Sequence, residues 1–236
     1  MHIVWYNNNN ICAKGVPMRK RVREIEFDVD AYTARLIGRE NVSKLEGAVL
    51  EIVKNAYDAD ANVCCLYYSN TEECVYIVDN GCGMKEEVLR SHWMTIGNSS
   101  KKSSYVTKNG RIQTGAKGIG RFALDRMSDE CDMLTISEEG GLEWIVDWRD
   151  FDGSKRISEV KARVYDTDVS LLEHVGIGSW RNRAVASEIE KYNFSGTGTA
   201  FRLNHLHDVW DERTMKRLRN HLENLLPPDV IQNFCI

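Results

Sequence analysis

The sequence predicts an α+β fold in which helices stack on one face of a largely antiparallel sheet. Three observations support this class. The predicted elements follow one another as helix, hairpin, helix, hairpin, strand and helix. Each hairpin consists of two apolar, strand-like runs that are separated by a short polar turn. One long segment carries apolar residues with a period of 3.6, which is typical of a helix that covers a sheet. A chain of 236 residues is long enough for one domain with a sizeable core.

The first helix is expected in DVDAYTARLIG, beginning at Asp30 and ending near Gly38. The second spans residues 43–59, where Ser43 and Glu46 have the spacing of a Ser-x-x-Glu capping box. Its apolar stripe comprises Leu45, Val49, Ile52, Val53 and Ala56. Further helices are expected around residues 85–94, from KGIGRFALDRM onward, and in DERTMKRLRNHLENLL, which Pro227 and Pro228 stop.

The strands are expected in two hairpins and two single runs. The first hairpin joins NVCCLYY to CVYIVDN through SNTEE, and the second joins CDMLTIS to LEWIVDWRDF through EEGG. Residues 155–165 and GTAFRLNHL supply the two further strands. The long polar stretch 97–116 has the length of a functional loop, and no element is assigned to residues 166–195.

The composition is that of an ordinary globular protein, with 42% hydrophobic and 28% charged residues. A net charge of −4 argues against a uniformly basic nucleic-acid binder; the run KRLRNHLENL is either a local basic patch or a solvated helix face.

Seven cysteines without a Cys-x-x-Cys pair make a poor disulfide framework or zinc site. His205 and His207 would share a strand face, as a metal site or as a partly exposed strand end. Since no run reaches the roughly 18 apolar residues of a membrane span, we expect a cytoplasmic protein.

Polar side chains share one face of the second predicted helix. Glu51, Asn55 and Asp58 are spaced at i, i+4 and i+7, opposite the apolar stripe. Taken alone, this spacing is typical of a solvated face. Only together with the motifs that follow does it indicate a functional site.

A second motif follows the second strand of the first hairpin. Asp79 is followed by NGCGM, in which Gly81 and Gly83 permit backbone conformations and close approaches that other residues obstruct. A carboxylate at the mouth of such a turn accepts a hydrogen bond from an exocyclic amine, such as that of adenine. The alternative is an ordinary Asp-Asn-Gly turn.

Two further motifs lie closer to the C-terminus. The run GAKGIG, Gly115 to Gly120, opens a helix, so its backbone N–H groups and the helix dipole favour a phosphate group. It is neither a Rossmann fingerprint nor a Walker A loop, because a polar loop precedes it and no Gly-Lys-Ser/Thr follows. The fourth motif is GTAFRL, in which Thr199 begins a strand.

In this order and at this spacing, the four motifs resemble the nucleotide-binding boxes of the GHKL ATPases, the family of gyrase, the large heat-shock chaperone, histidine kinases and the MutL mismatch-repair protein. EIVKNAYDA looks like the N box, DNGCGM and GAKGIGRF the two glycine boxes, and GTAFRL the closing strand. WMTIGNSSK favours the chaperone-like and MutL-like side. The resemblance covers roughly residues 30–225. It implies a Bergerat-type two-layer sandwich: a mostly antiparallel mixed sheet, helices on one face, and a long ATP lid at 97–116.

The resemblance also implies roles for the N-box residues. Glu51 would be the general base that polarises the attacking water, and Asn55 would bind Mg²⁺ through its side-chain oxygen. Asp58 would support the phosphate or ribose end of ATP.

The same resemblance implies a set of nucleotide-binding residues around the adenine and the phosphates. Asp79 would accept from the adenine amine, Thr199 would hold a shared water, and Gly83 would lie beside the ring. The first glycine box would contribute Gly81, Gly83 and Met84. The second would contribute Gly115, Lys117, Gly118, Ile119 and Gly120. One of Lys101, Lys102 and Lys117 would stabilise charge at the γ-phosphate.

The expected function is Mg²⁺-dependent ATP binding and slow ATP hydrolysis, with lid closure and homodimerisation as a conformational switch. The alternatives are a nucleotide-binding interaction module in a DNA-repair, chromatin-like or defence assembly, and a histidine-kinase-type phosphotransferase. A protein or DNA partner would bind through regions outside this chain.

Residues 1–24 are expected to be an N-terminal arm, 25–226 the ATP-binding domain with an insertion at 166–195, and 227–236 the start of a following segment.

Overall fold

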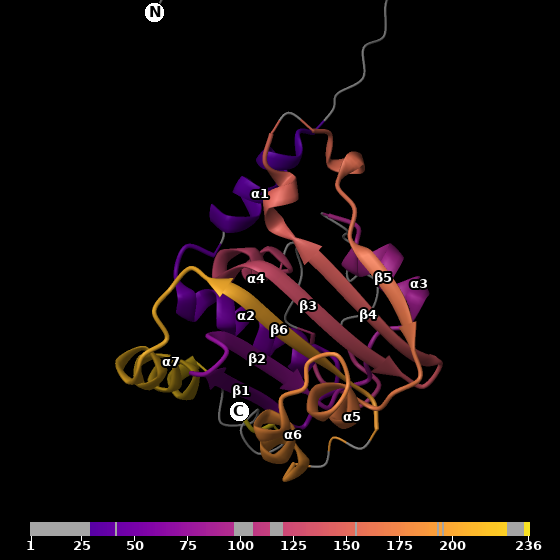
Figure 1. Cartoon of the computed structure of the whole chain (residues 1–236), viewed down its shortest axis with the longest axis vertical. Helices are drawn as coiled ribbons and strands as arrows, with labels where there is room; N and C mark the ends of the chain where they lie inside the picture. Colours follow the sequence, from indigo (N-terminus) through magenta and orange to yellow (C-terminus); the bar gives the residue numbers. More distant parts are fainter. Residues whose placement is uncertain are drawn as a thin grey trace, which may run out of the picture.

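A computed structural model describes residues 29–40, 42–96, 106–113, 120–153, 155–192, 194, 196–225 and 234–236. Within these ranges one six-stranded sheet has the order β1-β2-β6-β3-β4-β5, and neighbouring strands pair antiparallel (Figure 1). The strands are β1 (Cys64–Ser69), β2 (Cys74–Asp79), β3 (Ser128–Ser137), β4 (Gly140–Asp147), β5 (Arg163–Thr167) and β6 (Gly198–Leu206). The α+β class and both predicted hairpins, β1–β2 and β3–β4, are confirmed.

The central position of β6 determines which chain segments meet. This last strand lies between β2 and β3, with Thr199 opposite Asp79 on one side and opposite Thr135 on the other. Three residues that are far apart in the chain therefore form one row across the sheet.

One face of the sheet carries the larger helical layer. It consists of α1 (Ala31–Glu40), α2 (Leu45–Asp58), α4 (Phe122–Met127) and α7 (Glu212–Leu225), whose buried residues share one core. Figure 1 shows α2 behind the strands, α1 above the sheet and α7 to its left. Shorter helical elements contribute residues to the same core, namely the π-helical turn η1 (Leu89–Trp93) and the 3₁₀ turns η3 (Trp148–Phe151) and η4 (Ile157–Glu159). The short α3 (Glu86–Val88) directly precedes η1. The predicted apolar stripe of α2 is buried, and Val75, Ile77 and Phe201 of the strands face it in the same core.

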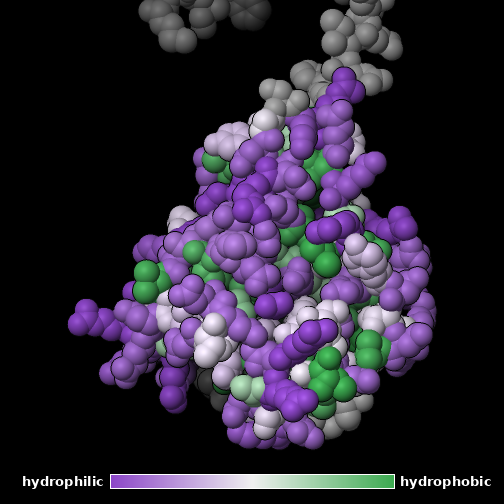
Figure 2. Space-filling view, viewed as in Figure 1, coloured by the Kyte–Doolittle hydropathy of each residue, from purple (hydrophilic) through white to green (hydrophobic). Residues whose placement is uncertain are grey.

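The other face of the sheet is also partly covered, which adds a layer to the expected one-sided arrangement. Helices α5 (Leu171–Gly176) and α6 (Arg183–Glu190) pack there on Tyr76, Val78 and Ala200, and they lie in front of the strands in Figure 1. These helices come from residues 166–195, for which no element was predicted. Their outer surface is mostly hydrophilic, with apolar residues in small separate groups (Figure 2). Strand β2 is buried at every position because both of its faces are covered.

The predicted capping box of α2 was wrong, and α1 ends two residues beyond Gly38. The capping box does not form: Lys44 is the N-cap of α2 without a side-chain hydrogen bond, and the Glu46 carboxylate instead accepts from Arg217 of α7. Asp30 does begin α1, since its Oδ1 accepts from the backbone N–H of Tyr32 at 2.9 Å. That helix continues past Gly38, because this glycine allows close packing on the ring of Phe122 rather than ending the helix.

The two ends of the chain are only partly described. The expected arm at residues 1–24 lies outside the described residues, as does most of 227–236. Cys235 forms a parallel bridge with Val63 beside β1, through the bonds Cys64 N–H to Cys235 O and Cys235 N–H to Asn62 O, both 2.8 Å. Within the described segments, no helix is long and apolar enough to cross a membrane.

Candidate functional site

The polar side of α2 faces the start of α4. A Cβ placed on Gly120 would lie 3.5 Å from Asn55 Nδ2 and 3.9 Å from Glu51 Oε2, so the end of the second glycine box lies directly against these two side chains. Glu51 and Asn55 are partly exposed, whereas Ile52 and Ala56 on the same helix are buried. The structure therefore brings together residues that the chain separates by about seventy positions.

The Glu51 carboxylate is not enclosed. Its Oε1 lies 2.9 Å from Lys54 Nζ, and both side chains are more than one third exposed, at 36% and 37%. An exposed pair of this kind contributes at most about 1 kcal/mol, so Glu51 can exchange this partner for another at little cost. Asp58 lies at the last residue of α2, also partly exposed.

Asp79 ends β2 and is the buried carboxyl of the site, with 6% of the residue exposed. Burial raises the pKa of Asp79 to about 7, opposed by hydrogen bonds from the backbone of Gly81 and Thr199. The bond from Gly81 N–H to Asp79 Oδ1 is 2.9 Å long. A further hydrogen-bond donor at this carboxyl would favour its ionised form.

A chain of hydroxyl contacts continues from Asp79 across the sheet. Thr199 Oγ1 lies 3.1 Å from Thr135 Oγ1, which accepts from the backbone N–H of Met84 at 2.7 Å. Sequence reasoning missed Thr135, because only the pairing of β3 with β6 places this threonine beside Thr199. The first glycine box and the Gly-Thr strand are thus joined by a fully buried side chain.

The turn after Asp79 is held on two sides. Gly83 has a left-handed backbone with φ of 64°, and a Cβ there would collide with the carbonyl group of Ile136. This position requires glycine for both its conformation and its close approach, as the motif predicted. Gly81 lies on the other side of the turn, against Ala59 at the end of α2.

Several predicted residues cannot be placed. Those outside the described residues are Lys101, Lys102, Gly115, Lys117, Gly118 and Ile119. Of the expected lid, residues 106–113 are described: they contact the C-terminal end of α2 through Asp60 and Arg111, two residues that no motif marked.

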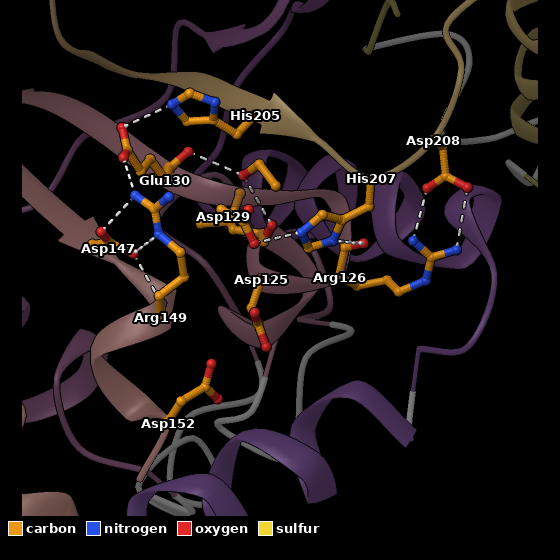
Figure 3. Close-up of polar contacts among 12 residues, drawn as sticks. Asp125, Arg126, Asp129, Glu130, Asp147, Arg149, Asp152, His205, His207 and Asp208 are labelled. Carbon is orange, nitrogen blue, oxygen red and sulfur yellow. Dashed lines mark hydrogen bonds and ion pairs between the residues drawn. The ribbon is translucent and has the colours of Figure 1, made fainter.

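The histidine pair near the end of β6 does not converge on one point. His205 Nε2 lies 3.7 Å from Glu130 Oε2, and His207 Nε2 lies 2.8 Å from Asp129 Oδ1 (Figure 3). Each histidine therefore has a separate carboxylate neighbour. In the part of the chain that is described, no three His, Cys, Asp or Glu side chains are grouped as a metal site would need.

Comparisons with known proteins identify the family of this chain. The family model described as histidine kinase-, DNA gyrase B- and HSP90-like ATPase matches residues 42–177, more than half of the chain. The chain is 37% identical over 75 residues to a putative type II restriction enzyme, HgiDII, of Herpetosiphon aurantiacus, which covers 32% of this chain. It is 28% identical over 149 residues to the chaperone protein HtpG of Buchnera aphidicola, covering 56% of this chain, and 38% identical over 81 residues to the ATPase morc-1 of Caenorhabditis elegans, covering 33%.

These relatives are much longer than the matched region, which makes up 12%, 23% and 9% of their respective lengths. The family match includes Glu51, Asn55 and Asp79 and the turn that follows Asp79. The chain therefore belongs to the family of histidine kinase-, DNA gyrase B- and HSP90-like ATPases and contains a nucleotide-binding domain of this type.

Proposed function

We propose that this chain binds Mg²⁺–ATP and hydrolyses it slowly, and that lid closure and homodimerisation couple ATP binding to a change of conformation. The observation that carries this proposal is the contact of Gly120 with Glu51 and Asn55. A helix N-terminus that follows a glycine run favours phosphate, and a carboxylate and an amide oxygen beside it suit water and a metal ion.

The adenine end is assigned to Asp79. Its buried carboxyl would accept a hydrogen bond from the exocyclic amine of adenine, while guanine presents a carbonyl oxygen in the corresponding position and would leave Asp79 without a donor. Thr199, whose hydroxyl is fixed by Thr135, would hold a water shared between the base and Asp79. Gly81, Gly83 and Met84 would line the ring.

The phosphate end is assigned to α2 and the second glycine box. Glu51 would leave Lys54 and polarise the water that attacks the γ-phosphate, so catalysis would consist mainly of positioning and electrostatic stabilisation. Backbone N–H groups of residues 115–120 would bind the phosphates. One of Lys101, Lys102 and Lys117 would face the γ-phosphate, and Asp58 would support the ribose or phosphate end.

The residues present fit a magnesium ion. Mg²⁺ takes hard oxygen ligands and keeps most of its octahedron for water and substrate phosphates, so one amide oxygen from the protein is sufficient. Asn55 would supply this oxygen beside Glu51. When bound, Mg²⁺ would neutralise negative charge on the phosphates.

A second candidate function is a nucleotide-dependent interaction module with little turnover. One observation favours it: the matched region makes up less than a quarter of the length of each relative. In such an assembly ATP binding would control contacts with a protein or DNA partner outside this chain.

Single-turnover hydrolysis and equilibrium ATP binding test the proposal in wild type, Glu51→Ala and Asp79→Asn. We expect Glu51→Ala to bind ATP and lose hydrolysis, and Asp79→Asn to lose affinity. If wild type binds ATP but hydrolyses it no faster than Glu51→Ala, the hydrolysis proposal fails and the interaction module is favoured. If Asp79→Asn binds ATP as well as wild type, the adenine assignment is wrong.

Matched controls separate these effects from general destabilisation. Glu46→Ala removes a carboxylate from the same helix, where it contacts Arg217 rather than the site. Asp132→Asn changes another aspartate whose pKa is raised by burial, on β3. Both controls should retain ATP affinity and hydrolysis.

A further inference from the structure

Residues 106–113 form a small hairpin at the end of α2. Val106 and Ile112 form an antiparallel bridge, and Thr107 N–H donates to Arg111 O at 2.9 Å. Asp60, which has a left-handed backbone with φ of 61° just after α2, accepts from Thr107 Oγ1 at 2.5 Å and from Asn109 N–H at 3.2 Å. The hairpin is therefore attached to the turn that follows α2.

Arg111 makes the most extensive of these contacts. Its Nη1 donates to the carbonyl oxygens of Ala61 at 2.5 Å and Tyr57 at 3.3 Å, and its Nη2 donates to Asn62 Oδ1 at 3.1 Å. The guanidinium carbon also lies 4.8 Å from the centroid of the Tyr57 ring. A cation beside carbonyl groups at and just after a helix C-terminus complements the dipole of that helix. Arg111 thereby fixes the turn formed by residues 59–62.

The same turn holds the segment that follows Asp79. Ala59 O accepts from Cys82 N–H at 2.8 Å, and Asn80 Oδ1 accepts from the backbone N–H groups of Asn62 at 2.9 Å and Val63 at 3.0 Å. The turn 59–62 is thus bound to the hairpin through Arg111 on one side and to residues 80–82 on the other.

We propose that Arg111 is a positioning residue for nucleotide affinity. By holding the turn 59–62, it holds residues 80–82 and with them the orientation of the Asp79 carboxyl. The inference rests on the proposed function, in which Asp79 accepts from adenine. Because Arg111 acts through backbone at the adenine end, its loss raises KM and the dissociation constant for ATP and leaves kcat unchanged.

Binding and hydrolysis in Arg111→Ala and Arg111→Lys test this assignment. We expect Arg111→Ala to raise the dissociation constant of ATP about tenfold, since charge-assisted hydrogen bonds to three acceptors are lost. The single-turnover rate at saturating ATP should stay at the wild-type value. Arg111→Lys should recover part of the affinity, because an ammonium group still reaches a carbonyl oxygen but does not replace the planar fork.

Inosine triphosphate, which lacks the exocyclic amine, supplies a sharper readout. If Arg111 acts by orienting Asp79, this nucleotide should bind wild type and Arg111→Ala equally. Arg126→Ala is the matched control. Like Arg111, Arg126 donates both to a backbone carbonyl, of Ser43, and to a side chain, of Asp208. The Arg126→Ala substitution should change the affinity for neither nucleotide.

Amide hydrogen exchange tests the mechanical link without any nucleotide. In Arg111→Ala the backbone N–H groups of Asn62, Val63 and Cys82 should exchange faster than in wild type and in Arg126→Ala. If wild type binds no ATP, the proposed function fails and the affinity claim fails with it, whereas exchange still reports whether Arg111 holds the turn. With ATP bound by wild type, the assignment of Arg111 is overturned by an unchanged dissociation constant, by a loss of kcat at constant KM, or by an equal loss for inosine triphosphate.

Discussion

Arg35 of α1 and Asp125 of α4 form a buried ion pair in which the guanidinium contacts both carboxylate oxygens. Arg35 Nε donates to both oxygens of Asp125 at 2.9 and 3.1 Å, and the two side chains are 7% and 0% exposed. Arg35 Nη1 also reaches Asp152 Oδ1 at 2.6 Å. This contact fixes α1 to the short helix whose N-terminal side carries Gly120 beside Glu51 and Asn55.

Removing one partner of this pair should be strongly destabilising. Arg35→Ala leaves a carboxylate enclosed without its main cation, which costs about 3–5 kcal/mol of unfolding free energy. Urea unfolding measures this loss. The double variant Arg35→Met/Asp125→Leu leaves no buried charge from the pair and should be more stable than Arg35→Ala; equal stability of the two would show that the ion pair is not the cause.

The raised pKa of Asp79 predicts a pH dependence of stability. An aspartate has an ordinary pKa of about 3.9, and in the folded protein this value is about 7. Between the two values the folded protein holds a proton that the unfolded chain has released. The contribution of Asp79 is therefore fully present below about pH 4 and is lost as the pH rises through 7.

Asp79→Asn provides the reference for this effect, because asparagine does not titrate. The unfolding free energy of wild type relative to Asp79→Asn should fall between pH 5 and pH 8 by denaturant unfolding. A difference that stays constant over this range would exclude a raised pKa at Asp79.

Gly83→Ala should destabilise the protein more than a conformational penalty alone explains. Gly83 and Gly153 both have positive φ, at 64° and 93°, but an added Cβ collides with the Ile136 carbonyl only at Gly83 and meets open space at Gly153. Gly153→Ala should cost about 1 kcal/mol, the usual strain of a left-handed alanine. Thermal unfolding should show a clearly larger loss for Gly83→Ala; equal losses would contradict the close approach.

Thr135→Val tests the hydroxyl chain at the adenine end. The substitution keeps the shape but leaves Met84 N–H and Thr199 Oγ1 without the Thr135 hydroxyl, at a cost of about 1–3 kcal/mol. ATP affinity should also fall, because Thr199 loses the group that orients it. Thr214→Val changes another buried threonine, on α7, and should leave ATP affinity unchanged, as calorimetry would show.

The sequence was sufficient for the elements whose signals are local. Residue spacing predicts the apolar stripe of α2 and both hairpins. Backbone sterics predict that position 83 requires glycine. What it did not provide depends on distant segments. Glu46 was predicted to cap its own helix, but Arg217 from the far end of the chain binds its carboxylate. The helix was predicted to end near Gly38, but it continues to Glu40, and the packing of Gly38 on Phe122 is a contact that local sequence does not reveal.

The same reason limits prediction of the candidate site. The resemblance implies that Asp79 and Thr199 both serve the adenine end; the structure pairs them across β2 and β6, and their roles stay predictions. Thr135 and Arg111 belong to no motif, and their positions depend on strand register and on how residues 106–113 pack. Helices α5 and α6 were not predicted, because the apolar runs in 166–195 are too short to indicate a helix by themselves. These apolar residues are buried only by packing on the second face of the sheet.

The position of β6 also has a consequence for synthesis and folding. Of the six described strands, the last in sequence is inserted in the middle of the sheet, so β2 and β3 have no common neighbour until residues 198–206 have left the ribosome. Until then, two hairpins present unpaired inner edges, which are the edges most prone to pair with other chains. Closure requires contacts across more than a hundred residues, which slows folding. Chaperones that shield nascent strands would therefore have most effect on this protein during the interval before β6 emerges.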